Sequence, residues 1–243
     1  MEAAHMSAQH KARPTHHIDV EARPKPLRLP LHRCALVVID MQHQFCSPGG
    51  LSHDSGADIG CARRVIDPIQ RLLSAFRDRG LPVIHTREGF LPDLSDCPPS
   101  MLQRIQRNGQ PLVGQMGALG RILVRGEPGH EIIPELAPAP GEIIIDKPGI
   151  GTFGLTDLES ILHRSDVDHL LVTGVTTDVC VHTFIREAND RGFNCVLIED
   201  ACASFDPELH AAAVAMTVQQ GGLFGWVAST GTVIRALDQS TVP

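Results

Sequence analysis

Residues 34–40 read Cys34-Ala-Leu-Val-Val-Ile-Asp40, a continuous apolar run rich in β-branched side chains that ends in a carboxylate. Apolar runs without alternation are typical of strands covered on both faces, as in a parallel sheet. Similar runs recur at residues 82–86, 142–146, 169–174, 193–199 and 224–228. Segments that we expect to be helical lie at 57–79, 156–164, 178–191, 207–221 and 230–237. This alternation predicts an α/β fold, a Rossmann-like three-layer α/β/α sandwich around a mainly parallel six-stranded sheet.

The chain of 243 residues is long enough for one large domain or two small ones. No internal repeat or second domain is visible, so the sequence predicts one domain over residues 31–243. Residues 1–30 are polar and rich in His and Pro, and we expect an N-terminal arm or tail that either packs on a partner subunit or is disordered. Residues 87–140 are rich in Gly and Pro, and loop regions of this length are usually functional.

The composition excludes several classes of protein. With 21 Lys+Arg against 28 Asp+Glu, the formal charge of −7 argues against a nucleic-acid partner. No apolar run approaches the ~18–20 residues of a membrane helix, and residues 1–30 contain no signal-peptide segment. We therefore expect a cytoplasmic protein with no membrane partner, in which the seven widely spaced cysteines are free thiols. Cys34 and Cys195, inside apolar strands, are expected in the core.

Three chemically active side chains follow three of the predicted strands. Asp40 ends the first strand, Lys147 follows the third, and Cys180 comes after the fourth, at the start of a helix. Ligands of open α/β sheets bind beyond the carboxyl ends of the strands, so we expect these groups to converge at adjacent strand ends. A helix N-terminus and a nearby ammonium both lower the pKa of a thiol and favour the thiolate.

Such a trio is suited to acyl transfer. Asp40 is the candidate general base and later general acid, and backbone N–H groups of the turn 174–180 are candidates to hold an oxyanion. Taken singly, Cys180 is as compatible with a core position as with catalysis, whereas Asp40 alone is better explained as a capping or turn residue and Lys147 alone as a solvated loop charge. Their occurrence together at one sheet edge favours a site at which a Cys is acylated and water is the final acceptor.

Three motifs resemble the isochorismatase-like cysteine hydrolases: Val38-Ile-Asp-Met-Gln42 with Phe45, Asp146-Lys-Pro-Gly149 with Phe153, and Thr173-Gly-Val-Thr-Thr-Asp-Val-Cys-Val181. The resemblance implies a catalytic triad of Asp40, Lys147 and Cys180, and no cofactor. It also implies a non-proline cis peptide between Val175 and Thr176, an oxyanion hole made by the N–H groups of Thr176 and Cys180, and a homo-oligomer, often a tetramer.

Within this family the chain looks most similar to biuret hydrolases and to their triuret- and ureidoacrylate-cleaving relatives, on the stretches 85–89, 120–129, 186–192 and 220–225. That resemblance implies an amidohydrolase that cleaves a C–N bond of a small linear ureido compound through a Cys thioester, releasing ammonia or a ureido product. It implies that Gln220 binds a carbamoyl group of the substrate and that Phe45 walls the pocket, and it makes Arg104, Arg107 and Thr177 further candidates for substrate binding. Arg104 and Arg107 are at least as compatible with a solvated basic loop. Ile150 is a departure, because relatives that cleave biuret tend to carry Lys there.

Several alternatives remain open or are disfavoured. Another small-amide hydrolase of the same family, of ureidoacrylate type for example, and a non-catalytic member that binds a small ligand or a partner both stay possible. No metal is expected, since Thr86-Arg87-Glu88 stands where nicotinamidases carry Asp-x-His, and His16-His17 is a weak candidate. Residues 149–154 match the dinucleotide motif G-x-G-x-x-G, but the next strand ends in Gly174 and not in the acidic residue that binds ribose.

Overall fold

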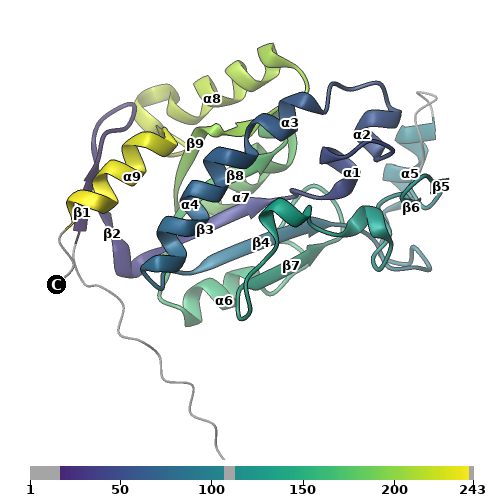
Figure 1. Ribbon diagram of the computed structural model, residues 1–243, viewed down its shortest axis with the longest axis horizontal. Coiled ribbons are helices and arrows are strands. Elements are labelled where there is room, and N and C mark those ends of the chain that lie inside the picture. Colours follow the sequence, from purple (N-terminus) through teal and green to yellow (C-terminus); the bar gives the residue numbers. More distant parts are fainter. Residues whose placement is uncertain (1–16, 107–112, 241–243) are drawn as a thin grey trace, which may run out of the picture.

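A six-stranded parallel sheet forms the centre of the molecule (Figure 1). The computed structural model describes residues 17–106 and 113–240, with the side chains of 103–106 outside this description. The strands lie in the order β10–β9–β8–β3–β4–β7, and every neighbouring pair is parallel. Their bounds are β3 (Cys34–Ile39), β4 (Val83–Glu88), β7 (Ile143–Lys147), β8 (His169–Val175), β9 (Asn194–Ala203) and β10 (Trp226–Ala228).

Helices cover both faces of the sheet, and β3 is therefore buried at every position. Leu36 and Val38 pack on one face with α3, α4 and α9, and Val37 and Ile39 pack on the other with α6, α7 and α8 (Figure 1). The three-layer sandwich is therefore confirmed. The helix expected over 57–79 is divided at Val65. The bounds are α3 (Gly60–Arg64), α4 (Ile66–Asp78), α6 (Leu158–Arg164), α7 (His182–Asp190), α8 (Pro207–Gly222) and α9 (Thr230–Gln239).

Residues 17–30 form a hairpin on the domain's own surface. Strand β1 (His17–Val20) pairs antiparallel with β2 (Leu27–Pro30), and η1 (Leu31–Arg33) leads into β3. Ile18, Val20, Leu27 and Leu29 are buried in the same core as α4 and α9. The arm or tail expected over 1–30 is thus corrected for this part of the chain, while residues 1–16 lie outside the described residues.

A cap of short elements lies beyond the carboxyl ends of the strands. Phe90, Val113, Ile122 and Leu123 form its own small hydrophobic cluster, against which Phe45 packs. The described residues that follow β4, 89–106 and 113–140, therefore form a folded cap and not a plain loop. The short elements in and around it are α1 (His43–Cys46), α2 (Leu51–Asp54), α5 (Pro99–Gln106), β5 (Met116–Gly117), β6 (Gly120–Arg121), η2 (Pro128–His130) and η3 (Pro134–Leu136).

All seven cysteines are free, as the sequence predicts, and all of them are buried. Cys34 and Cys195 are fully buried in strands, which confirms their place in the core. Of the helices in the described residues, none combines the length and the apolar character that crossing a membrane requires. The homotetramer implied by the resemblance stays a prediction.

Candidate active site

The three candidate catalytic side chains meet at the carboxyl edge of the sheet. Asp40 follows β3, Lys147 is the last residue of β7, and Cys180 lies in η4 (Thr177–Val181), a π-helical turn between β8 and α7. Lys147 Nζ lies 2.9 Å from Asp40 Oδ2 and 3.7 Å from Cys180 Sγ. Asp40 and Lys147 are fully buried and Cys180 is 6 % exposed. The fold therefore brings the acid, the amine and the thiol together.

A second carboxyl group, Glu88, completes the cluster. Strand β4 lies between β3 and β7, so the three strand ends are not all adjacent as expected, and the last residue of β4 fills the gap. Cys180 Sγ donates to Glu88 Oε2 at 3.5 Å, and Lys147 Nζ lies 3.6 Å from the same oxygen. Sequence reasoning missed Glu88 because the second strand was expected to end at Thr86, two residues early.

Asp40 is held so that one carboxylate oxygen is kept for the site. Its backbone has a φ of 51°, in the left-handed region, and its N–H donates to the carbonyl and hydroxyl oxygens of Thr86, both at 3.2 Å. The Thr86 hydroxyl donates to Asp40 Oδ1 at 2.6 Å. Among the described residues, Oδ2 accepts no hydrogen bond of regular geometry and faces the Lys147 ammonium. Oδ2 is therefore the oxygen available to take a proton.

Lys147 supplies the positive charge of the site. Burial alone lowers the pKa of this amine, but the charges of Asp40, Cys180 and Glu88 outweigh burial and raise the net pKa. Oxygen and sulfur atoms of these three acidic side chains lie within 4.8 Å of one another, the kind of donor set that can hold a metal ion. The ammonium lies 2.9 Å to 3.7 Å from all three, and so occupies the place of a cation.

The segment that matches the dinucleotide motif serves the protein itself. Lys147 Nζ donates to the carbonyl oxygens of Gly149 at 2.7 Å and Ile150 at 3.2 Å. Glu187 Oε2 accepts the N–H groups of Thr152 and Phe153 at 2.7 Å and 3.1 Å. These backbone groups position the lysine and the following turn instead of facing a phosphate.

The surroundings of Cys180 raise the pKa of its thiol, whereas a helix N-terminus and a nearby ammonium are expected to lower it. Burial is the main cause that raises the pKa of Cys180; Lys147 lowers this pKa, and Asp40 and Glu88 raise it further. Burial also raises the pKa of Glu88, against the opposing effect of Lys147. Burial thus favours the protonated forms of Glu88 and Cys180, while the Lys147 ammonium lies nearest to the Asp40 carboxyl group, at 2.9 Å.

The turn before Cys180 has the backbone form that the resemblance implied. The Val175–Thr176 peptide is cis, and both residues line a cavity. The Thr176 carbonyl accepts hydrogen bonds from the N–H groups of Val179 and Val181, both at 3.1 Å. The N–H of Cys180, between these two residues, does not donate to this carbonyl. The oxyanion hole assigned to the N–H groups of Thr176 and Cys180 stays a prediction.

The structure divides the predicted substrate-binding residues. Phe45 lines the cavity, as expected. Thr177 is buried, does not line the cavity, and its hydroxyl hydrogen-bonds to His210 Nδ1 at 2.8 Å. The side chain of Arg104, in α5, and the whole of Arg107 lie outside the described residues.

Gln220 does not reach the cavity of its own chain, which corrects the expected contact with the substrate. Phe205 lines the cavity just before α8 begins, but Gln220 is exposed at the far end of that helix. The helical residues between them, twelve from Pro207 to Val218, span roughly 18 Å at ~1.5 Å per residue. The position of Gln220 in the sequence does not by itself show that α8 carries it this far from the cavity.

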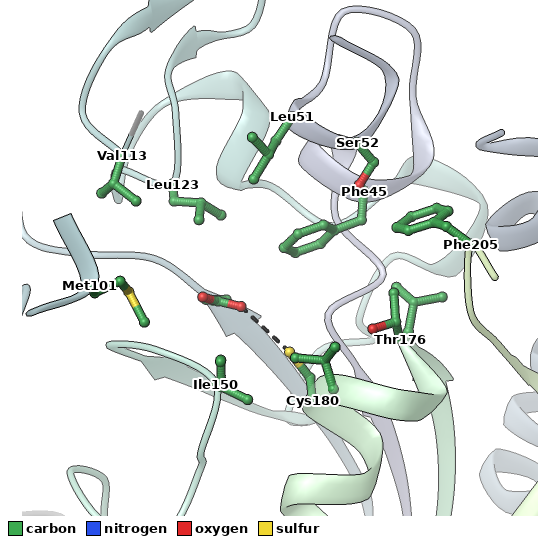
Figure 2. A pocket seen from close by; sticks show the side chains of 13 residues that line it. Phe45, Leu51, Ser52, Met101, Val113, Leu123, Ile150, Thr176, Cys180 and Phe205 are labelled. Atoms are coloured by element: carbon green, nitrogen blue, oxygen red, sulfur yellow. Dashed lines mark hydrogen bonds between the residues drawn. The ribbon is translucent and has the colours of Figure 1, made fainter. Parts of the chain in front are cut away.

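The cavity above Cys180 has a volume of about 430 Å³. Glu88, Thr176, Cys180 and Ser52 are the polar residues among the described ones that line it, and apolar side chains form the rest. In Figure 2, Leu51, Leu123 and Val113 lie across the cavity from Cys180, and a dashed line marks the hydrogen bond of the Cys180 thiol. The remaining lining residues are Phe45, Met101, Ile150, Val175, Val179 and Phe205.

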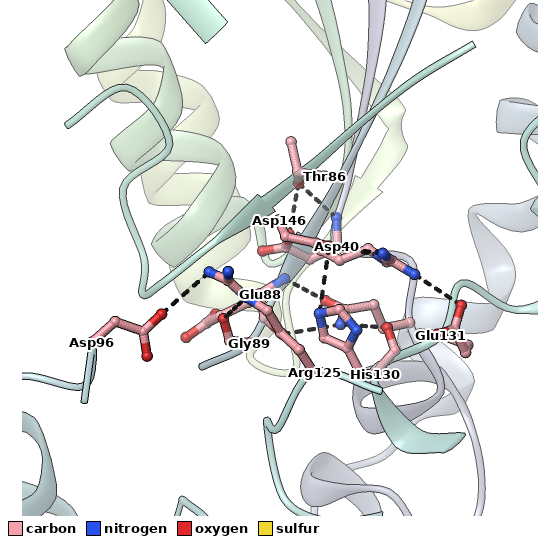
Figure 3. A network of polar contacts seen from close by, with 11 residues as sticks. Asp40, Thr86, Glu88, Gly89, Asp96, Arg125, His130, Glu131 and Asp146 are labelled. Carbon is pink, nitrogen blue, oxygen red and sulfur yellow. Dashed lines mark hydrogen bonds and ion pairs between the residues drawn. The ribbon is translucent and has the colours of Figure 1, made fainter. Parts of the chain in front are cut away.

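Polar contacts tie Glu88 to the cap (Figure 3). Gln42 is fully buried and binds the backbone of Glu88 twice, with its Oε1 2.7 Å from the Glu88 nitrogen and its Nε2 3.0 Å from the Glu88 carbonyl. The same Nε2 donates to the carbonyl of His130 at 2.8 Å. On the other side of β4, Arg87 joins Asp146 and Glu131 at 2.7 Å and 2.8 Å. The backbone of Glu88 is therefore tied through Gln42 to the cap.

Comparisons with known proteins agree with this geometry. The family model of the isochorismatase domain matches residues 34–231. The chain is 29 % identical over 223 residues to the ureidoacrylate amidohydrolase RutB of Yersinia enterocolitica, covering 91 % of this chain and 96 % of that protein.

Two solved structures carry the same fold. A cysteine hydrolase from Pseudomonas syringae superposes with a TM-score of 0.72 and 28 % identity, over 87 % of this chain and 95 % of that one. The N-carbamoylsarcosine amidase of Thermoplasma acidophilum superposes with a TM-score of 0.62 and 25 % identity, over 82 % and 96 %.

Proposed function

Since this chain belongs to the isochorismatase family, whose domain model spans residues 34–231, we propose that it is a cysteine-dependent amidohydrolase of small linear ureido compounds. The observation that carries the proposal is a buried thiol at a cavity floor, beside the ion pair of Asp40 and Lys147 at 2.9 Å. The similarity to a ureidoacrylate amidohydrolase and to an N-carbamoylsarcosine amidase supports cleavage of a carbamoyl C–N bond. Biuret and triuret are the substrates that the sequence resemblance suggests.

The first half of the reaction forms a thioester. Asp40 Oδ2 takes the thiol proton as Cys180 Sγ attacks the carbonyl carbon, and the Lys147 ammonium, 3.7 Å from the sulfur, stabilises the developing thiolate. The N–H groups of Thr176 and Cys180 hold the oxyanion of the tetrahedral intermediate. Asp40 then returns the proton to the leaving nitrogen, and ammonia or a ureido product departs.

The second half releases the acyl group. Water attacks the thioester carbonyl, Asp40 Oδ2 takes a proton from this water, and the Cys180 sulfur leaves and is protonated again. Glu88, whose carboxyl lies 3.5 Å from the sulfur, is placed to accept an N–H of the carbamoyl group. A ureido group carries N–H donors on both sides of its carbonyl, which suits a site with two carboxyl groups.

A substrate panel tests this function. Ammonia release is followed with biuret, triuret, ureidoacrylate and simple aliphatic and aromatic amides. We expect turnover of ureido compounds and slower or no turnover of the simple amides. Activity confined to aromatic amides, with no ureido compound cleaved, would contradict the proposal. A chain that binds these compounds and cleaves none would instead support the non-catalytic alternative.

Replacing Glu88 by Gln should lower kcat/KM by about 10- to 100-fold, because leaving a buried hydrogen-bonding group of the substrate without its acceptor costs roughly 1–3 kcal/mol. The same change should alter the pH dependence of stability. Because burial raises the pKa of Glu88, the folded wild type holds a proton that the unfolded chain loses above its ordinary value of 4.5. Stability contributed by Glu88 is therefore lost as the pH rises from about 4.5 through the folded pKa.

The Gln variant lacks this dependence, so its stability relative to wild type should rise with pH over that window. Urea unfolding at pH 4.5, 6 and 7.5 measures the difference, with the exposed Glu208→Gln as the matched control. A difference that is constant across the three pH values would show that Glu88 holds no proton in the fold.

A further inference from the structure

The cavity points to the chemical class of the substrate's non-reacting part. Resting on the proposed function, we propose that the site takes a monosubstituted urea whose substituent is apolar, an aryl or branched alkyl group, in preference to biuret or triuret. The substituent would lie against the wall opposite Cys180, while the carbamoyl group lies against Glu88 and the turn at Thr176.

Among the described residues, the wall opposite Cys180 offers few hydrogen-bond partners for a second ureido group. Leu51, Val113 and Leu123 form it (Figure 2). Among the described lining residues outside the reacting cluster, Ser52 is the one with a polar side chain. The carbonyl and N–H groups in the tail of biuret would leave water without gaining hydrogen bonds there, which is unfavourable for polar groups.

The apolar wall is part of a packed core and not a chance exposure. Val113 and Leu123 are each 5 % exposed and belong to the hydrophobic cluster of the cap, together with Phe90 and Ile122. Their positions are therefore set by packing, and reorienting them toward a polar ligand would disrupt the cap. An apolar substituent, by contrast, gains from removal of water at this surface.

Size and shape point to the same class of substituent. A volume of about 430 Å³ lies within the ~300–1,000 Å³ of pockets that hold drug-sized ligands, and exceeds what biuret fills. Phe45 and Phe205 flank the space above Cys180 and Thr176 (Figure 2). Aromatic rings at this place suit contact with a flat or branched apolar group that extends from the carbamoyl nitrogen.

Ammonia release from phenylurea, isobutylurea, methylurea and biuret by the full-length protein tests the inference. We expect kcat/KM for phenylurea or isobutylurea to exceed that for methylurea and biuret by at least about 10-fold, the scale of apolar discrimination in a hydrophobic pocket. If biuret or methylurea is cleaved fastest, the inference is wrong while the proposed function stands. If no urea is cleaved, the result contradicts both the proposed ureido hydrolysis and the inferred preference in turnover.

Binding to the inactive Cys180→Ser variant, measured by calorimetry, gives an independent readout. Tighter binding of phenylurea than of biuret supports the apolar wall even without turnover, and equal or weaker binding contradicts it. Ile150→Asn changes a cavity-lining side chain that is 38 % exposed, so the fold should tolerate it. It should raise KM for phenylurea about 3- to 10-fold and leave KM for biuret unchanged. The increase in KM is expected to be smaller than for a change at a buried residue of the wall, because Ile150 is partly exposed.

Leu155→Asn is the matched control, because Leu155 is 71 % exposed and lies outside the cavity lining. It should leave both KM values unchanged. Equal changes in KM for phenylurea and biuret in the Ile150 variant would overturn the apolar assignment.

Discussion

Replacement of Cys180 by serine should lower kcat on every ureido substrate by at least about 10³-fold, the scale seen when a catalytic nucleophile is lost. The thiol of Cys180 has a raised pKa, and Asp40 is the base that removes its proton during attack. A serine hydroxyl is a far weaker acid than a thiol, so a carboxylate cannot activate it to a comparable degree. The substitution is nearly isosteric, and the fold and ligand binding should persist.

The matched control is Cys61→Ser, since Cys61 is also buried but lies in α3, outside the lining of the catalytic cavity. It should keep wild-type kcat. Circular dichroism and urea unfolding would establish that both variants are folded. Residual turnover of the Cys180→Ser variant within 10-fold of wild type would contradict the assignment of the nucleophile.

Replacement of Lys147 by methionine should destabilise the protein and abolish activity together. Lys147 and Asp40 are both fully buried and lie 2.9 Å apart, so the variant leaves Asp40 and Glu88 buried with no cation. Breaking a buried ion pair by removing one partner costs about 3–5 kcal/mol of unfolding free energy. Because the folded pKa of Lys147 is raised above 10.5, its stabilising contribution is complete below that pH and is lost only as the pH rises through the folded pKa.

The wild type should therefore keep this contribution from pH 5 to pH 9, whereas the deficit of the variant should shrink as the pH falls toward ~4, where unpaired carboxylates take up protons. Urea unfolding at pH 4, 5, 7.5 and 9 checks both statements. Lys25→Met, at an exposed position in the turn of the N-terminal hairpin, is the control. A Lys147 variant as stable as wild type at pH 7.5 would show that the ammonium does not hold the cluster together.

The sheet could be predicted because its strands are continuous apolar runs rich in β-branched residues, as in Cys34–Ile39, and such runs are typical of strands covered on both faces. The hairpin of residues 17–30 was missed, although Ile18 and Val20 alternate with polar neighbours. Its strands have four residues each and enclose a Pro-rich turn. The polar, Pro-rich composition of residues 1–30 therefore favoured a tail over the short alternation of apolar and polar residues that indicates a strand.

The triad could be predicted because strand ends meet at one edge of a parallel sheet whatever the loops between them do. The raised pKa of the Cys180 thiol could not be predicted, because it depends on burial and on Glu88. The position of Cys180 at a helix N-terminus, on which the sequence prediction was based, takes neither into account. The apolar wall of the cavity could not be predicted either. Val113 and Leu123 come from a segment without apolar periodicity, and the packing of the cap turns them toward the cavity. Two facts would have pointed to Glu88: the strand order, which places β4 between β3 and β7, and the end of β4 at Glu88 and not at Thr86.

Mass spectrometry of the protein quenched in acid during turnover tests the central claim, that Cys180 carries the acyl group. With a ureido substrate that is cleaved, we predict a mass increase equal to the acyl fragment on the peptide that contains Cys180. This increase should be absent from the Cys180→Ser variant and unchanged in Cys61→Ser. Continued turnover with an unmodified Cys180 peptide, or an adduct on any of the other six cysteines, would contradict the account.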